Sequence, residues 1–254
     1  TWHTRASVGF TRDVGRLYGT IALSAELWDN QDRVLSSGAI LDQDARDQRL
    51  FESQIRLGYR ISPGFELLGR FRGIRYLTVG DGARDWDGMG YELAVGLAME
   101  TSPLLRWRLL GGFGIRDFDQ RSLNSFQTGL IEGEVQWLPT ELVTVTASVS
   151  RAIIETLGDG AGDNGGRVDT AFAARLQYEI WRNLVLTLGG ELRDQSYIGS
   201  DRHDRSVSGR IGLEYLINKQ WMLTLAYEHQ RRFSNLEELD LTRNVVTLGA
   251  KLRF

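Results

Sequence analysis

The stretch RVDTAFAARLQYEIWRNLVLTLGGELRDQSY, residues 167–197, carries the pattern that decides the fold. Between residues 168 and 180, one set of alternate side chains is mostly apolar, while the other set includes Arg175 and Glu179. Alternation with a period of two is typical of a β-strand, because successive side chains point to opposite faces of a sheet. A break at Arg182 is followed by a second alternating run. We therefore predict a β-hairpin of two long strands.

The same hairpin recurs along the chain. Tight reversals occur at Ser62-Pro63-Gly64, Ser102-Pro103, Pro139-Thr140 and Asn218-Lys219. Longer connections, rich in acidic residues and glycine, lie at residues 30–46, 78–87, 119–124, 157–166, 198–204 and 235–240. Short turns at one end of a repeated unit and long polar loops at the other predict an antiparallel up-and-down meander.

Composition narrows the class of protein. The chain has 254 residues, of which 42% are hydrophobic and 10% aromatic, with 29 glycines and 3 prolines. Because no apolar run approaches the ~18 residues of a membrane helix, this composition favours one large all-β domain with long strands. The formal net charge of −3 gives no support to a nucleic-acid partner. Cysteine is absent from the sequence, which excludes disulfides and thiolate metal sites.

The alternating runs predict strands that are long for a globular protein. They occupy residues 4–13, 16–29, 47–60, 65–77, 88–100, 104–118, 125–138, 141–155, 167–180, 184–197, 204–217, 220–234 and 241–254. Globular strands usually have ~5 to 6 residues, whereas a tilted strand needs ~9 to 11 residues to cross the hydrocarbon of a membrane. The lengths therefore favour a transmembrane barrel over a soluble sandwich.

Two further features support a membrane barrel. The polar face of the strands carries bulky charges in mid-strand, such as Arg108 and Glu132, which a water-filled lumen accommodates. Aromatic residues gather near both strand ends, as membrane interfaces favour. One expected girdle, near the tight turns, includes Tyr59, Trp137, Trp181, Tyr215 and Trp221, and the other, near the long loops, includes Trp28, Tyr76, Trp86, Phe118, Phe126, Tyr197 and Phe233.

The predicted strand number is odd, whereas single-chain bacterial barrels have even numbers. Either an N-terminal strand is missing from residues 1–254, which gives 14 or more strands, or residues 1–15 form an irregular arm or a single bulged strand, which gives 12. We favour the first. The predicted fold is thus all-β, a single outer-membrane domain over residues 1–254 that forms a transmembrane up-and-down antiparallel β-barrel of 12 to 14 or more strands.

The C-terminal stretch VVTLGAKLRF, residues 245–254, places five apolar residues on one strand face: Val246, Leu248, Ala250, Leu252 and Phe254. Such a strand with a terminal phenylalanine resembles the signal by which bacterial outer-membrane proteins are handed to the barrel-assembly machinery. It implies that machinery as a partner during biogenesis.

The hairpin pattern and the ending LDLTRNVVTLGAKLRF resemble the putative β-barrel porin 2 family of proteobacterial outer-membrane proteins, some of which are encoded with exopolysaccharide export systems. The resemblance is clearest over residues 167–254. It implies an integral protein of the bacterial outer membrane, in contact with membrane lipid and lipopolysaccharide. Proteins of polysaccharide export or of the cell envelope are the further partners it implies.

The polar strand face supplies the candidate functional residues. We expect a lumen lined by Glu52, Arg56, Arg60, Arg70, Arg72, Glu92, Arg106, Arg108, Glu132, Glu134, Arg175, Arg210, Glu214 and Glu228. One interpretation is a ladder of cross-strand ion pairs that stiffens the wall. The other is a charged constriction near the tight turns, in which the guanidinium groups of Arg60, Arg70, Arg106 and Arg108 favour anionic solutes or acidic sugars. Few aromatic residues are expected to point inward.

Two classes of function remain open. The barrel is either a channel, for small solutes or for export of a polysaccharide, or a structural or assembly component with a plugged lumen. Residues 30–46, which contain VLSSGAIL, would be the plug in the second case.

An enzyme is a distant third hypothesis. Asp85 and Asp87, facing Asp201 and His203, resemble the residues that activate water in omptin proteases, but omptins have ten strands and such residues are common in solvated loops. The remaining histidines, His3 and His229, give no catalytic triad, and Asp159, Asp163 and Asn164 lack the ligand spacing of a calcium loop. We expect no enzymatic activity, no cofactor and no bound metal.

Overall fold

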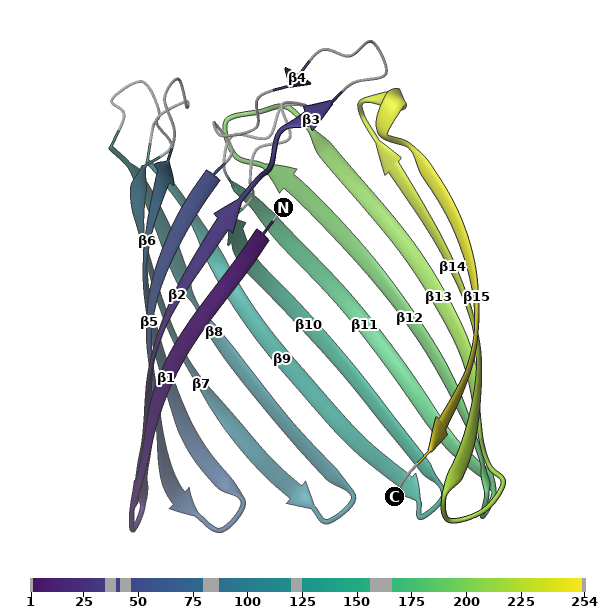
Figure 1. Cartoon of the computed structure of the whole chain (residues 1–254). Coiled ribbons are helices and arrows are strands. Elements are labelled where there is room, and N and C mark those ends of the chain that lie inside the picture. The colour runs from purple at the N-terminus through teal and green to yellow at the C-terminus, as the bar shows by residue number, and fades with distance from the viewer. Residues whose placement is uncertain are drawn as a thin grey trace.

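A computed structural model describes residues 2–34, 40–41, 47–79, 87–119, 125–155 and 166–252. These residues form one sheet of 13 strands in which each strand pairs antiparallel with its neighbours in the sequence (Figure 1). The strands of this sheet are β1 (Trp2–Val14), β2 (Leu17–Asp29), β5 (Asp47–Ser62), β6 (Phe65–Val79), β7 (Gly88–Ser102), β8 (Leu105–Phe118), β9 (Phe126–Thr140), β10 (Val143–Glu155), β11 (Gly166–Trp181), β12 (Leu184–Tyr197), β13 (His203–Leu216), β14 (Trp221–Ser234) and β15 (Leu241–Leu252).

Three small elements lie outside the large sheet. The strands β3 (Arg33–Val34) and β4 (Ile40–Leu41) pair only with each other, and a 3-10 turn, η2 (Glu237–Leu239), precedes β15. Among the described residues, no helix has the length and apolar character needed to cross a membrane.

The structure confirms the predicted all-β meander, and each predicted strand is present with shifts of a few residues at its ends. Residues 167–197 form the hairpin of β11 and β12, in which Ala173 faces Glu191 and Tyr178 faces Leu186. The alternative of an irregular or bulged N-terminal segment is wrong, because β1 pairs with β2 in continuous register from Trp2 to Val14. The chain keeps its alternation there, so the pairing needs no bulge.

The two ends of the strands differ, as the sequence predicts. We call the end that carries the tight turns the turn end and the opposite one the loop end. At the turn end, Gly15 and Gly64 have φ angles of 63° and 73°, which lie in the left-handed region that glycine enters without a steric penalty. The backbone can therefore reverse within two residues at these positions.

The sheet curves into a barrel wall whose first and last strands are β1 and β15 (Figure 1). These two edge strands do not pair with each other among the described residues. Both run from the loop end to the turn end, as the N-terminus at the top of Figure 1 and the C-terminus at its bottom show. An antiparallel partner for either free edge therefore has to run in the opposite direction.

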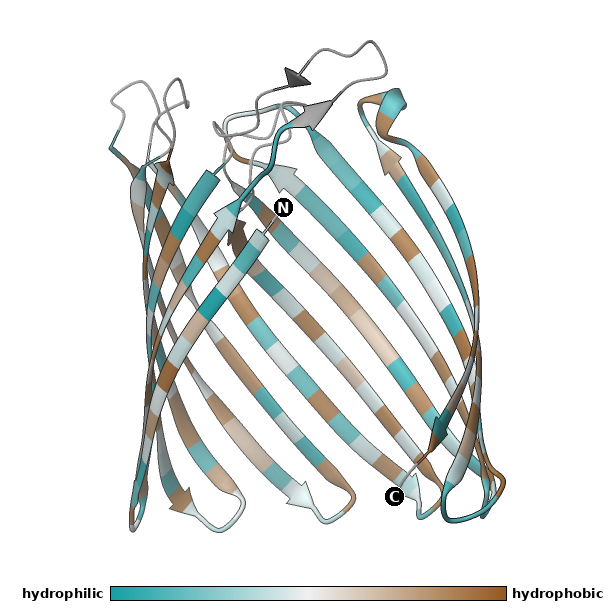
Figure 2. Cartoon of the chain, in the orientation of Figure 1, coloured by the Kyte–Doolittle hydropathy of each residue, from teal (hydrophilic) through white to brown (hydrophobic). Residues whose placement is uncertain are grey.

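The outer face of the wall is apolar. Figure 2 shows hydrophobic and hydrophilic residues alternating along the strands. Large apolar side chains are exposed on this face, among them Val95 at 62%, Phe172 at 59% and Leu248 at 79% of their full exposure. At the turn end, Tyr59, Trp137, Trp181, Tyr215 and Trp221 are also exposed, which agrees with the predicted girdle. Such a surface suits the hydrocarbon and interfaces of a membrane.

The predicted girdle at the loop end is wrong for five of its aromatic residues. Trp28, opposite Gln48, and Phe126, opposite Arg116, lie on the polar face. Tyr76, Phe118 and Tyr197 are buried rather than exposed. Tyr76 and Phe118 occupy the same alternate positions of β6 and β8 as Arg72 and Arg116, so their rings share the polar face. The expectation that few aromatic residues point inward is therefore also wrong. Tyr76 and Phe118 belong to a buried cluster whose other members are Ile74, Leu130, Ile153 and Ile198. Trp86 lies outside the described residues.

Candidate functional site

One long-range contact identifies the concave face of the wall. The Arg70 guanidinium on β6 lies 2.5 Å from the Glu132 carboxylate on β9, although β7 and β8 lie between them. Strands are about 4.8 Å apart, so side chains three strands away from each other meet only where the wall curves toward them. The cross-strand register places the predicted lumen residues on this same face. They are Glu52, Arg56, Arg60, Arg70, Arg72, Glu92, Arg106, Arg108, Glu132, Glu134, Arg175, Arg210, Glu214 and Glu228.

Strands β5 to β9 carry a network of short ion pairs on the concave face. Arg72 lies 3.0 Å from Glu52 and 3.1 Å from Glu92. Arg116 approaches Glu92 to 2.8 Å, and the side chains of Arg116 and Glu92 are only 2% and 4% exposed. Charges so far from water are tolerated only when they are paired and hydrogen-bonded. This part of the wall thus contains the ladder of ion pairs considered in the sequence analysis.

The four arginines of the predicted constriction do not form a cluster of unpaired charge. Arg60 lies 2.7 Å from Asp13 and over the ring of Tyr18, at 4.8 Å from its centroid. Arg108 lies 3.3 Å from Glu134. The remaining two also have carboxylate partners: Arg106 with Glu100 at 3.5 Å and Arg70 with Glu132. Each of these four positive charges thus lies beside a carboxylate.

A polar groove follows strands β10 to β14 on the same face. Its volume is about 810 Å³. Hydroxyl and amide side chains make up much of its lining, namely Thr146, Ser148, Gln177, Thr187, Ser206, Ser208 and Gln230. The charged residues of the lining are Arg175, Arg193, Arg210, Arg232, Glu191 and Glu228. Within this region, Arg193 lies 2.8 Å from Glu191 and 3.1 Å from Asp169.

Other charged residues of this second region are held loosely or have no partner among the described residues. Arg210 and Glu228 lie 3.7 Å apart, and both side chains are more than one third exposed. Arg175 is exposed and makes no hydrogen bond or ion pair with any described residue. Glu214, and Arg56 on β5, likewise have no such partner among the described residues. These groups remain available to water or to a solute.

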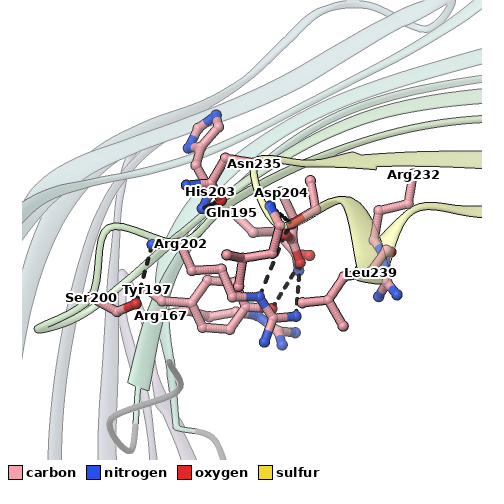
Figure 3. Close-up of polar contacts among 12 residues, drawn as sticks. Arg167, Gln195, Tyr197, Ser200, Arg202, His203, Asp204, Arg232, Asn235 and Leu239 are labelled. Carbon is pink, nitrogen blue, oxygen red and sulfur yellow. Dashed lines mark hydrogen bonds and ion pairs between the residues drawn. The ribbon is translucent and has the colours of Figure 1, made fainter. Parts of the chain in front are cut away.

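At the loop end, a buried network links the connection between β12 and β13 to β14 (Figure 3). Asp204 has no exposed surface and lies 3.0 Å from the Arg202 guanidinium. The Tyr197 and Ser234 hydroxyls donate to the Asp204 carboxylate at 3.2 Å and 2.6 Å. Arg202 also covers the Tyr197 ring, 4.0 Å from its centroid. The network holds this connection against the rim of the wall.

Sequence reasoning missed this network. Residues 198–204 look like a solvated loop, because glycine, serine and charged residues dominate the segment. The sequence does contain a signal for a buried network: Arg202 and Asp204 carry opposite charges two residues apart, and the aromatic Tyr197 precedes them. Gly199 has a φ angle of 68°, which allows the turn that brings them together.

The residues of the omptin-like hypothesis have local structural partners. The Asp87 carboxylate accepts a hydrogen bond from the Thr78 backbone at 2.6 Å. His203 lies 3.1 Å from the Asp194 carboxylate, and the Asp201 carbonyl accepts a bond from Asn235 at 2.8 Å. Three predicted sites lie wholly or partly outside the described residues: Asp85, the calcium-loop residues Asp159, Asp163 and Asn164, and most of the plug at residues 30–46.

The proposed assembly strand is β15. Val246 and Leu248 on this strand are 71% and 79% exposed, and they face Tyr227 and Leu225 of β14 across the outer surface. Ala250 and Leu252 continue the same face, opposite Leu223 and Trp221. Phe254 lies outside the described residues.

Comparisons with known proteins extend these observations. The sequence profile of a family described as "Putative beta-barrel porin 2" matches residues 2–254. A search of curated proteins found no match.

Several solved structures of outer-membrane transport proteins share the fold. The FrpB iron transporter from Neisseria meningitidis has a TM-score of 0.63 at 9% identity, over 99% of this chain and 48% of that one. The copper transporter OprC has a TM-score of 0.60 at 11% identity, over 98% of this chain and 49% of that one. The siderophore receptor PirA from Pseudomonas aeruginosa has a TM-score of 0.52 at 13% identity, over 98% and 56%. The chain thus spans about half the length of these proteins, and the likeness shows the fold alone.

Proposed function

The chain belongs to the family described as "Putative beta-barrel porin 2", and from that premise we propose that it forms a channel for small polar solutes in the bacterial outer membrane. The observation that carries the proposal is the polarity of the two faces. The outer face presents exposed apolar side chains, while the concave face presents ion pairs and a polar groove. A barrel with this arrangement encloses water within a lipid environment.

The reverse arrangement is unfavourable on energetic grounds. An arginine or lysine that faces lipid at the bilayer midplane costs roughly 2 to 4 kcal/mol. The concave face carries charges along its whole height, from Arg60 near the turn end to Arg193 near the loop end. These groups therefore need an aqueous lumen, and a water-filled lumen is what a channel requires.

Location and partners follow from the same premise. We propose that the loop end faces the outside of the cell and the turn end the periplasm, as in bacterial barrels with long external loops. Lipopolysaccharide and membrane lipid would then contact the outer face, and the barrel-assembly machinery would bind β15 during insertion. Export of a polysaccharide is a narrower form of the channel proposal, and it would require a partner protein of the envelope.

Single-channel recording in planar bilayers tests the channel. The full chain, inserted from detergent, is expected to give steady open currents in potassium chloride. Detergent without protein serves as the control for leaks. Protease protection of the strands shows whether the chain has inserted. An inserted chain that gives no current would overturn the proposal.

One observation favours a second candidate, a structural component with a blocked lumen. Near the loop end, Ile74, Tyr76, Phe118 and Leu130 form a buried cluster on the concave side. Apolar packing at this level narrows the space through which solute would pass. If the wild-type chain is silent and truncation of this cluster, for example Tyr76→Ala, restores current, the blocked form is correct.

A further inference from the structure

Some arginines of the concave face are held closely by carboxylates, and others have no partner among the described residues. On β5 to β9, guanidinium groups such as those of Arg72 and Arg116 are held by carboxylates at 3.1 Å or less. On β11, the exposed Arg175 guanidinium has no partner among the described residues. A guanidinium in this condition keeps all five of its donors for a solute.

We propose that the groove along β10 to β14 is a binding site for sugar acids, that is, small polyhydroxylated solutes that carry a carboxylate, with Arg175 as the carboxylate contact. The proposal rests on the channel function proposed above and names its class of solute. A planar guanidinium binds a carboxylate through two parallel hydrogen bonds, which is the strongest arrangement that an arginine offers to a small anion.

The residues around Arg175 leave room for such a solute. In the register of the sheet, Arg175 faces Thr146 on one side and Gly189 on the other. A side chain built at Gly189 would meet only the Ala174 carbonyl at 3.8 Å and the Arg210 Cβ at 4.0 Å, so the space above this glycine is open. The volume of about 810 Å³ falls within the range of ~300 to 1,000 Å³ that small-molecule sites occupy.

The remaining lining selects for hydroxyl groups. Gln177, Thr187, Ser206 and Ser208 contribute side chains that both donate and accept hydrogen bonds, as sugar hydroxyls do. The residues that line the groove include no aromatic ring, so recognition would depend on hydrogen bonds rather than on stacking against a sugar. Arg193 is paired with Glu191 and Asp169, and Arg210 lies near Glu228. Arg175 and Arg232 therefore supply the positive charge in the lining that favours an anion over a neutral or cationic solute.

The experiment measures binding and conduction separately, with D-glucuronate as the probe and D-glucose as its neutral counterpart. Isothermal titration calorimetry on the full chain in detergent is expected to show binding of glucuronate and weaker binding of glucose. Arg175→Gln should weaken glucuronate binding about tenfold, which corresponds to the loss of one charge-assisted hydrogen-bonded contact. The affinity of Arg175→Lys for glucuronate should lie between those of the wild type and Arg175→Gln, because lysine keeps the charge and loses the second hydrogen bond.

Arg56→Gln provides the matched control. Arg56 is also exposed, lies on the concave face and has no partner among the described residues, but it belongs to β5 and does not line the groove. This variant should bind glucuronate as the wild type does. Heat-dependent migration of each variant in gels reports whether the barrel is folded, so a folding defect is recognised.

The outcomes separate the two proposals. Wild-type affinity in Arg175→Gln, or an equal loss in Arg56→Gln, would overturn the site while the channel stands. A chain that binds glucuronate and loses this binding in Arg175→Gln, yet passes no current, would retain the site and remove the channel. Equal affinity for glucuronate and glucose would show that the carboxylate is not recognised, which also overturns the site.

Discussion

Strands β5 to β9 and strands β10 to β14 contribute to one sheet and one concave face, yet they use charge differently. In the first region, Glu92 faces inward between Arg72 and Arg116 and is bonded to both, at 3.1 Å and 2.8 Å. In the second, Arg193 is held by Glu191 at 2.8 Å, but serine, threonine, glutamine and glycine surround Arg175, which has no partner among the described residues, and Arg210 and Glu228 stay 3.7 Å apart. The comparison teaches that the spacing of charges across strands decides whether they stiffen the wall or face the lumen.

The largest effect on stability is expected from removing the Glu92 carboxylate, which Arg72 and Arg116 share. Glu92→Gln should lower the free energy of unfolding by roughly 3 to 5 kcal/mol, because the buried Arg116 guanidinium loses the counter-charge at 2.8 Å, whereas Arg72 keeps Glu52 at 3.0 Å. Urea-induced unfolding in detergent micelles or liposomes measures the change. Glu228→Gln in the looser region is the matched control, and equal losses from the two variants would contradict the distinction between the regions.

The second region has close pairs of its own, Arg193 with Glu191 at 2.8 Å and, buried at its loop end, Arg202 with Asp204 at 3.0 Å. Asp204→Asn should lower stability by about 1 to 3 kcal/mol, because Arg202 and the Tyr197 hydroxyl lose a charged acceptor in a buried site. Protease cleavage between β12 and β13 should become faster. Asp201→Asn is the control, since only the backbone carbonyl of Asp201 accepts the bond from Asn235. Unchanged cleavage in Asp204→Asn would show that the network does not hold this connection.

A double-mutant cycle on Arg210 and Glu228 tests the looser pairing directly. The coupling energy should be about 0.2 to 1 kcal/mol, as for other exposed ion pairs. It should also fall with added salt, because the pair is open to solvent. A coupling as large as the effect of Glu92→Gln would mean that the longer separation does not reflect a weaker interaction.

The smallest effect on stability is expected from filling the groove itself. Gly189→Leu adds a side chain where the nearest atoms lie 3.8 Å or more from the new Cβ, so the fold should tolerate it. Single-channel conductance should nevertheless fall partially, since the side chain occupies part of the lumen. Gly69→Leu is the control. A Cβ at Gly69 has no atom within 4 Å, and Gly69 faces outward because its neighbour on β6, Arg70, lies on the concave face. Conductance that falls equally in both variants would exclude a local effect.

Sequence reasoning could predict the strands and the face to which each residue belongs, because both depend on a period of two. The positions of Arg175, Glu92 and Leu248 follow from parity alone once the hairpin at residues 167–197 has been recognised. Sequence reasoning left two strand counts open, 12 and 14 or more. The 12-strand alternative is wrong because β1 is a regular strand, and a fourteenth strand stays a prediction.

The remaining features depend on curvature and on side-chain length, which alternation does not encode. Tyr76 and Phe118 were assigned to a girdle because of their position along the strands, although their parity placed them on the polar face. Asp204 and Arg60 each have a partner that is distant in the sequence, namely Ser234 and Asp13. Whether the concave face admits a particular solute depends on these contacts, and so the candidate site was less predictable than the fold.

The bridge between Arg70 and Glu132 has a mechanical consequence. Three interstrand steps measure about 14 Å along a flat sheet, and side chains stand roughly perpendicular to the sheet, so a contact between these two is favoured where the wall curves. This ion pair therefore limits how far the wall can flatten between β6 and β9. At this height the outline of the pore is set by the combined reach of an arginine and a glutamate, in addition to the number and tilt of the strands.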